Sequence, residues 1–185
     1  MNKPTKIILW IFVPPAVLFI LAVVVRVFVT SLYVIPQEGM LPTYPPRTYI
    51  FGLKRPFFDR SAVQVGDVVV FEKTMNDGTY NFIWRVIALG GDKVETRGAG
   101  VKVNGVALAQ TPTDDRDGRN VVRETNGRSS YRILIAPARS GAPPDVSVVV
   151  PAGHFFAMGD NRFNAYDSRF TGTAPITVIK SKIVW

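Results

Sequence analysis

An uninterrupted apolar segment near the start of the chain limits most strongly what it can fold into. Residues Ile7 to Val25 include no charged or polar side chain, whereas Lys3 and Lys6 precede the segment and Arg26 follows it. About 20 consecutive apolar residues are enough for a helix to cross a bilayer. The segment therefore predicts one transmembrane helix.

The flanks of this segment predict its orientation. Cations before a membrane helix favour the cytoplasmic side, so we expect 1–6 to be a short cytoplasmic N-terminus, 7–26 a single-pass anchor in the inner membrane, and 27–185 a domain on the outer, periplasmic face. Pro14-Pro15 should kink the helix, which membrane helices tolerate. A cleaved signal peptide is the competing interpretation, but the segment is longer than a usual h-region and lacks a small-x-small exit.

Composition removes several classes of site. The chain has 185 residues, which leaves room for one soluble domain after the anchor. It has no cysteine and a single histidine, His154, so we expect no disulfide, no metal site and no cofactor. A net charge of +8 suits nucleic acid or anionic lipid. The anchor favours membrane lipid, and no nucleic-acid motif is present.

Short apolar runs separated by turn residues predict an all-β domain. No stretch after the anchor has a sustained helical period, and two Asn-Gly dipeptides, Asn104-Gly105 and Asn126-Gly127, are strong hairpin signals. We expect an extended entry over Val27 to Ile35, a strand pair formed by Val146–Val150 and His154–Met158, a solvated loop over 114–120, a linker over 136–145, and further strands at Val68–Phe71, Asn81–Leu89 and Ile176–Trp185. The fold class is mainly β, with closed or folded-over sheets.

Aromatic and cationic residues alternate between Tyr49 and Phe58. Such a segment fits either a membrane interface or a strand and loop with core aromatics. Both interpretations remain open from the sequence.

A polar loop late in the chain carries the most specific signal. Gly159 to Gly172 contains two aspartates and two arginines, and we expect two Asp/Arg pairs within the loop and unusual backbone angles at both end glycines. The loop resembles the signature GDNRxxSxDSR of the type I signal peptidases, which are membrane-anchored Ser/Lys proteases. Ile35 to Thr43 resembles that family's box IPSGSMxPT, and Arg85 to Asp92 resembles its box RVIGLPGD. The resemblance implies the family's coiled β-sheet fold and the same membrane orientation.

The residues that this family uses for chemistry are replaced. By resemblance, Gly39 stands at the nucleophile, Trp84 at the general-base lysine, Ala165 at the serine that orients the lysine, and Gln37 at the serine that helps bind the oxyanion. An indole cannot accept the proton that a lysine base takes. Loss of the nucleophile alone costs on the order of a million-fold in turnover. We therefore expect no catalytic residue, and we expect the protein to be inactive.

The frame around these positions is retained. The structural signature consists of Asp160, Arg162, Asp167, Ser168 and Arg169, and a possible peptide groove includes Met40, Pro42 and Trp84. Substitute chemistry has little support: Ser31 and Thr43 flank the box without an evident base, we expect Lys73 and Lys93 to be solvated strand-end charges, and we expect His154 to be a core or rim residue.

Three functions follow from this pattern. The leading hypothesis is an inactive signal peptidase I relative that binds signal peptides, exported precursors or another membrane protein at the outer face of the membrane. The first alternative is an active signal peptidase or conjugation-type maturation peptidase with a non-standard nucleophile. The second is a structural subunit of a membrane complex. The sequence leaves open whether Trp84 seals the groove or provides an aromatic contact.

Overall fold

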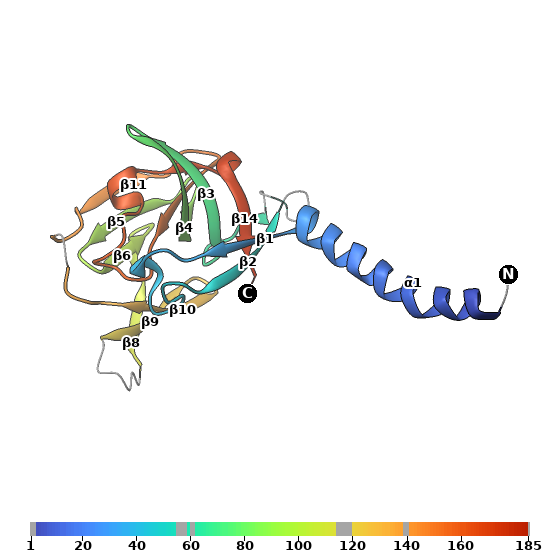
Figure 1. Cartoon of the computed structure of the whole chain (residues 1–185). Coiled ribbons are helices and arrows are strands. Elements are labelled where there is room, and N and C mark those ends of the chain that lie inside the picture. The colour runs from blue at the N-terminus through green and yellow to red at the C-terminus, as the bar shows by residue number, and fades with distance from the viewer. Residues whose placement is uncertain (1–2, 55–58, 60–61, 114–119, 139–140, 185) are drawn as a thin grey trace.

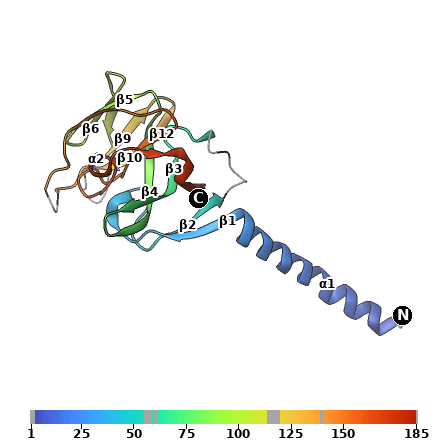
Figure 2. The same ribbon diagram turned by 90° about the horizontal axis from the view of Figure 1, so that it is seen from above.

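A long apolar helix leads into a β domain in the computed structural model (Figure 1), which describes residues 3–54, 59, 62–113, 120–138 and 141–184. Helix α1 (Lys3–Val24) includes Pro14 and Pro15 and continues as a π-helical segment, Val25–Val29. The window Phe12–Val29 has a mean hydropathy of 2.5 and no residue buried against the rest of the described chain. Figures 1 and 2 show α1 projecting away from the β domain. Its length and composition suit a membrane span.

The helix ends later than the sequence predicts. We expected an extended entry from Val27, but the helical segment continues to Val29, and strand β1 (Thr30–Val34) begins only after it. The β-branched residues at this end are exposed and apolar, so they extend the apolar surface of the helix. The expected start of the extended segment was therefore wrong by three residues.

Three antiparallel sheets form the domain. The seven-stranded sheet has the order β1-β2-β14-β3-β4-β12-β13, the four-stranded sheet β11-β5-β6-β7, and the three-stranded sheet β10-β9-β8. The strands after β1 are β2 (Tyr49–Lys54), β3 (Val68–Met75), β4 (Gly78–Leu89), β5 (Lys93–Arg97), β6 (Gly100–Val103), β7 (Val106–Ala107), β8 (Ala109–Pro112), β9 (Val121–Asn126), β10 (Ser129–Leu134), β11 (Val146–Val149), β12 (His154–Met158), β13 (Ala174–Pro175) and β14 (Ile179–Ile183). A short 3-10 segment, Glu38–Met40, follows β1, and another, Ile176–Val178, precedes β14. The mainly β fold expected from the sequence is confirmed, with a one-turn helix α2 (Ser168–Thr171) as a small addition.

Strands β4 and β12 divide the domain into two cores. Alternate residues of a strand point to opposite faces of its sheet. Val86 and Phe155 accordingly join one buried cluster, whereas Ile87 and Phe156 join the other. Both faces are covered, which explains why these strands read as continuous apolar runs in the sequence.

The two Asn-Gly dipeptides behave differently. Asn104 and Gly105, with φ of 52° and 80°, form the predicted two-residue turn between β6 and β7. In the second hairpin Asn126 pairs with Ser129, so Gly127 and the next residue form the turn instead. The Asn126 side chain is buried and donates to the backbone carbonyl of Ile87, which holds it in the strand. The hairpin expected at Asn126-Gly127 is therefore present, with Thr125 opposite Ser130 and with Asn126 in the strand rather than in the turn.

Strands β11 and β12 are neighbours in sequence but belong to different sheets. β11 pairs with β5, whereas β12 pairs with β4 and β13, so the expected pairing between them is wrong. A turn closed by a hydrogen bond from His154 N to Pro151 O, with Gly153 at φ 72°, carries the chain from one sheet to the other. The last strand starts at Ile179 rather than Ile176, behind the 3-10 segment. The expected loop over 114–120 lies almost wholly outside the described residues.

Candidate functional site

Asp160, the first aspartate of the signature loop, forms its ion pair with a residue outside the loop. Asp160 accepts hydrogen bonds from Arg85 of β4, Nε to Oδ1 at 2.8 Å and Nη2 to Oδ2 at 2.6 Å, and its carboxylate also accepts from the Thr43 hydroxyl. Burial alone lowers the pKa of the Arg85 guanidinium, but the hydrogen bonds and charge of Asp160 outweigh burial, so the pKa is raised. Both partners are buried. Arg85, Asp160 and Thr43 come from the three sequence boxes, so these hydrogen bonds bring the three boxes together.

The first arginine of the loop also finds its partner elsewhere. Arg162 is fully buried and donates to both carboxylate oxygens of Glu124 on β9, with Nη1 to Oε2 at 2.8 Å. The Tyr131 hydroxyl donates to Oε1 of the same carboxylate at 2.9 Å. Burial, with the nearby charge of Glu124 as a smaller cause, raises the pKa of Tyr131 well above its usual value. The expectation of two Asp/Arg pairs inside the loop is thus half wrong, because Asp160 and Arg162 each bind a distant strand.

The second half of the loop is closed internally. Asp167 forms a bidentate pair with Arg169, with Nε to Oδ1 at 2.9 Å and Nη2 to Oδ2 at 2.8 Å. The same carboxylate accepts from the backbone N of Arg169 at the start of α2 and from the backbone N of Gly159. Ser168 Oγ accepts from Ala157 N at 3.1 Å. Polar groups of the signature residues therefore hold the loop to β12.

The two end glycines of the loop are required for different reasons. Gly172 has φ of 72°, as expected, where only glycine is comfortable. Gly159 has no such angle, and the expectation for it was wrong. A Cβ added there would overlap the Ala165 Cβ and lie 2.6 Å from the carbonyl oxygen of Gly39. Gly159 therefore permits close contact between the loop and the segment after β1.

Gly39, Trp84 and Ala165 meet although they are distant in sequence. A Cβ built on Gly39 would lie 2.5 Å from Cη2 and 2.7 Å from Cζ3 of the Trp84 ring, and 3.6 Å from the Ala165 Cβ. Asn161 N donates to the Gly39 carbonyl at 3.0 Å, which fixes the backbone at this point. The indole thus fills the space into which a side chain at position 39 would project.

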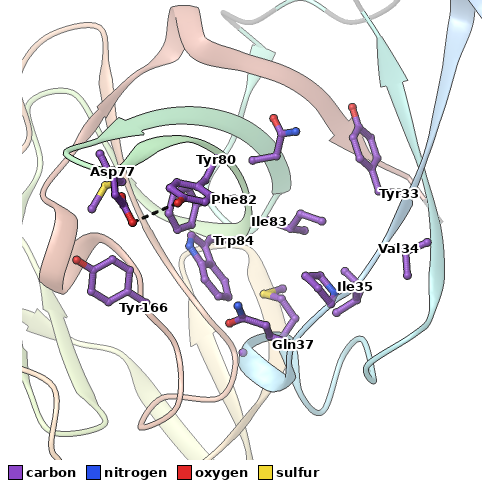
Figure 3. A pocket seen from close by; sticks show the side chains of 15 residues that line it. Tyr33, Val34, Ile35, Gln37, Asp77, Tyr80, Phe82, Ile83, Trp84 and Tyr166 are labelled. Atoms are coloured by element: carbon purple, nitrogen blue, oxygen red, sulfur yellow. Dashed lines mark hydrogen bonds between the residues drawn. The ribbon is translucent and has the colours of Figure 1, made fainter. Parts of the chain in front are cut away.

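A pocket of about 660 Å³ adjoins this contact. Figure 3 shows Trp84 between Gln37 and the aromatic side chains of β4. The pocket is lined by Tyr33, Val34, Ile35, Pro36, Gln37, Gly39, Met40, Met75, Asp77, Tyr80, Asn81, Phe82, Ile83, Trp84 and Tyr166. Among these described lining residues there is no serine, threonine, cysteine, lysine or histidine, and Asp77 is the one ionised group. Met40 and Trp84 line the pocket as expected for a groove, whereas Pro42 is not among its lining residues.

Other residues considered from the sequence lie elsewhere. Thr43 is engaged by Asp160 and Arg85, and Lys93 is an exposed strand residue paired with Glu95 at 3.0 Å, as a solvated charge would be. Lys73 differs from the expectation. Its Nζ donates to the backbone carbonyls of Thr171, Gly172 and Thr173, and burial lowers its pKa. Lys73 therefore links β3 to the end of α2 by hydrogen bonds and is not a free surface charge.

His154 is half-buried at the start of β12. Its Nδ1 lies 3.2 Å from the carbonyl oxygen of Ala152 in the preceding turn. The residue is a rim histidine, and it does not line the pocket.

Comparisons with known proteins identify the family of this chain. The model of the family described as "Signal peptidase, peptidase S26" matches residues 7–185. The chain belongs to the signal peptidase I family. It is 34% identical over 170 residues to a signal peptidase I of Pseudomonas fluorescens and 32% identical over 170 residues to that of Pseudomonas aeruginosa, in each case over 83% of this chain and 59% of the relative. The chain thus spans less than two thirds of the length of these two relatives. A solved signal peptidase I from Enterococcus faecalis matches 66% of this chain and 97% of its own, with a TM-score of 0.40 and 22% identity.

Several residues that hold the signature loop or line the pocket of this signal peptidase I relative were not predicted from the sequence. Glu124 was not singled out, although a fully buried arginine in the signature loop requires an acid from another strand. Glu124 follows Val122 by two positions and therefore shares its buried face of β9, so this spacing was the available signal. Asp77, Tyr80 and Tyr166 at the pocket had no signal of their own, because only the folded sheet brings them together.

Proposed function

We propose that this chain is a membrane-anchored, catalytically inactive signal peptidase I relative that binds an extended peptide segment of an exported or membrane protein. One observation carries the proposal. The Trp84 ring occupies the space of a side chain at position 39, with 2.5 Å between Cη2 and a Cβ built there. A nucleophile and this indole are mutually exclusive in the observed packing.

The composition of the pocket supports the loss of catalysis. A Ser/Lys hydrolase needs a hydroxyl and a neutral amine within hydrogen-bond reach. The hydroxyl groups among the described lining residues belong to Tyr33, Tyr80 and Tyr166. The Tyr33 hydroxyl is bonded to Ser181 and the Tyr80 hydroxyl to Asp77, and no lysine lines the pocket in the described part of the chain.

The backbone on both sides of the pocket supports peptide binding. β1 lies at one end of the seven-stranded sheet and pairs with β2. The first part of β4, up to Trp84, pairs with β3, and its pairing with β12 begins at Arg85. Both strands therefore present an open edge to the pocket, and an extended peptide can add main-chain hydrogen bonds to such an edge. Filling the lysine position with Trp84 leaves about 660 Å³ open, which favours a contact over a complete seal.

The apolar surfaces of the protein support contact with a membrane. We infer a single-pass anchor with the β domain on the outer face of the cytoplasmic membrane. The exposed side chains of Leu32 and Phe51 lie opposite one another on β1 and β2, as do those of Val34 and Tyr49. This face directly follows the exposed apolar helix, so both surfaces suit contact with lipid. Tyr49–Lys54 is also a strand with buried Ile50, so we infer that this segment serves both as a core strand and as part of the membrane interface. Residues 55–58 lie outside the described residues.

A cleavage assay tests the loss of catalysis. The full chain in lipid is incubated with a generic exported precursor beside a revertant that carries Gly39→Ser, Trp84→Lys, Ala165→Ser and Gln37→Ser. The matched control has Trp84→Met in place of Trp84→Lys and lacks only the base. We expect the parent and the control to be silent and the revertant to cut. Cleavage by the parent would show that another nucleophile acts and would refute the proposal.

A crosslinking assay tests binding separately. A photoreactive amino acid replaces Ile83, which lines the pocket, and in the control it replaces Val106, which is exposed on β7. We expect capture of an exported precursor from position 83 alone. Equal capture from both positions, or none from either, contradicts peptide binding in this pocket.

A further inference from the structure

The indole nitrogen of Trp84 is a buried donor without an acceptor. The residue is 7% exposed, and Nε1 makes no hydrogen bond in the described part of the chain. Arg162 and Arg169 each also have one unpaired buried nitrogen, but their other N–H groups bind carboxylates. The Trp84 side chain has a single polar atom, so the whole hydrogen-bonding capacity of that side chain is unused. Leaving a buried donor unpaired carries the full desolvation penalty of that group.

This donor lies at the pocket. Trp84 forms part of the wall, and Figure 3 shows its nitrogen turned toward the end where Asp77, Tyr80 and Tyr166 lie. The nitrogen itself exposes less than 1 Å², so binding of an acceptor requires a neighbouring side chain to move. Tyr80 and Tyr166 are 45% and 49% exposed, so such a movement disturbs little of the core.

The chemistry of the site selects a neutral acceptor. An indole N–H donates and cannot accept, so the ligand must supply a hydrogen-bond acceptor. Asp77 is the one ionised group among the described lining residues, and its negative charge disfavours a carboxylate ligand. A peptide strand between the edges of β1 and β4 presents uncharged main-chain carbonyls toward its neighbours.

We propose that Trp84 Nε1–H donates a hydrogen bond to a main-chain carbonyl of the bound peptide. The position of the family's general base then serves in recognition. This inference rests on the proposed peptide-binding function and adds the group that reads the peptide backbone. It also accounts for a tryptophan rather than a purely apolar side chain at this position.

Titration of a blocked peptide tests the inference. The full chain in detergent carries Trp10→Phe and Trp185→Phe, so that Trp84 gives a single indole signal. The probe is acetyl-Ala-Val-Ala-Gln-Ala-amide, which is uncharged and has main-chain carbonyls throughout. We expect saturable binding, a downfield shift of the Trp84 indole proton, and a loss of affinity of about 2- to 12-fold on Trp84→Phe, which corresponds to one neutral hydrogen bond.

The control variant is Tyr49→Phe, which removes an exposed aromatic hydroxyl on β2 that does not line the pocket. Its affinity should match that of the parent. Unchanged affinity in Trp84→Phe, or an indole proton that does not move on saturation, overturns the inference and leaves peptide binding intact. Absence of binding in the parent, the control and Trp84→Phe alike overturns the proposed function together with the inference.

Discussion

The contact between Gly39 and Trp84 predicts a measurable coupling between the two positions. Gly39 has a backbone conformation open to any L-residue, so Gly39→Ala adds only a methyl group. That methyl carbon would lie 2.5 Å from Trp84 Cη2, whereas carbon atoms prefer about 3.5 Å. The ring must therefore move by about 1 Å against Phe82 and Ala165, with which it packs. Overpacking of this kind costs about 1–3 kcal/mol.

A double-mutant cycle isolates the steric term. Trp84→Ala alone should cost about 3 kcal/mol, at the low end for loss of a buried aromatic group because the site borders a pocket. In the Trp84→Ala background, Gly39→Ala should cost almost nothing, so the two positions should couple by about 1–3 kcal/mol. Gly100→Ala on β6 is the control, since its new methyl would meet one backbone oxygen at 3.3 Å.

Urea unfolding of the full chain in mild detergent, followed by circular dichroism, measures these free energies. The parent, the two single variants, the double variant and the control are compared at one detergent concentration. A Gly39→Ala variant as stable as the parent, or additive effects in the double variant, would refute the claim that the indole occupies this space.

Three further predictions concern the buried polar groups. Asp160→Asn should lower the free energy of unfolding by about 3–5 kcal/mol, because it leaves the Arg85 guanidinium buried without its counter-ion. Glu95→Gln, in the exposed pair with Lys93, is the control and should lower it by under about 1 kcal/mol. Urea unfolding measures both free energies. Because the pKa of Tyr131 is raised in the folded state, its stabilising contribution is complete below pH 10 and is lost as the pH rises above 10, by up to about 1.4 kcal/mol per pH unit. Tyr131→Phe should therefore reduce the loss of unfolding free energy with pH above pH 10. An equal loss in the parent and in Tyr131→Phe would contradict the raised pKa of Tyr131. Lys73→Met should speed amide exchange in α2, measured by mass spectrometry, with no change in the β8–β9 hairpin.

The parts of the molecule predicted correctly are those set by local pattern or by motif. The apolar run from Ile7 predicts the helix, and Asn104-Gly105 predicts its hairpin, because each signal lies within a few neighbouring residues. That Gly39, Trp84 and Ala165 form one site stays a prediction from the motif frames; in the structure a Cβ built on Gly39 would lie within 3.6 Å of both other side chains.

The errors have a common physical cause, which is that long-range partners override local signals. Arg162 binds Glu124 on a distant strand instead of an aspartate in its own loop. Asn126 belongs to strand β9 rather than to the turn, and its side chain binds the carbonyl of Ile87. Lys73 is held by three carbonyls at the end of α2. None of these partners is visible before the sheets are assembled.

The packing of Trp84 against Gly39 has an evolutionary consequence. A mutation that restores only a serine at position 39 meets the indole, and one that restores only a lysine at position 84 places an amine beside a glycine with no hydroxyl to activate. Under the proposed loss of catalysis, neither change alone supplies a Ser/Lys pair, and the first lowers stability by an amount comparable to a tenth or more of a typical domain's total. A functional pair at these two positions therefore requires both changes together.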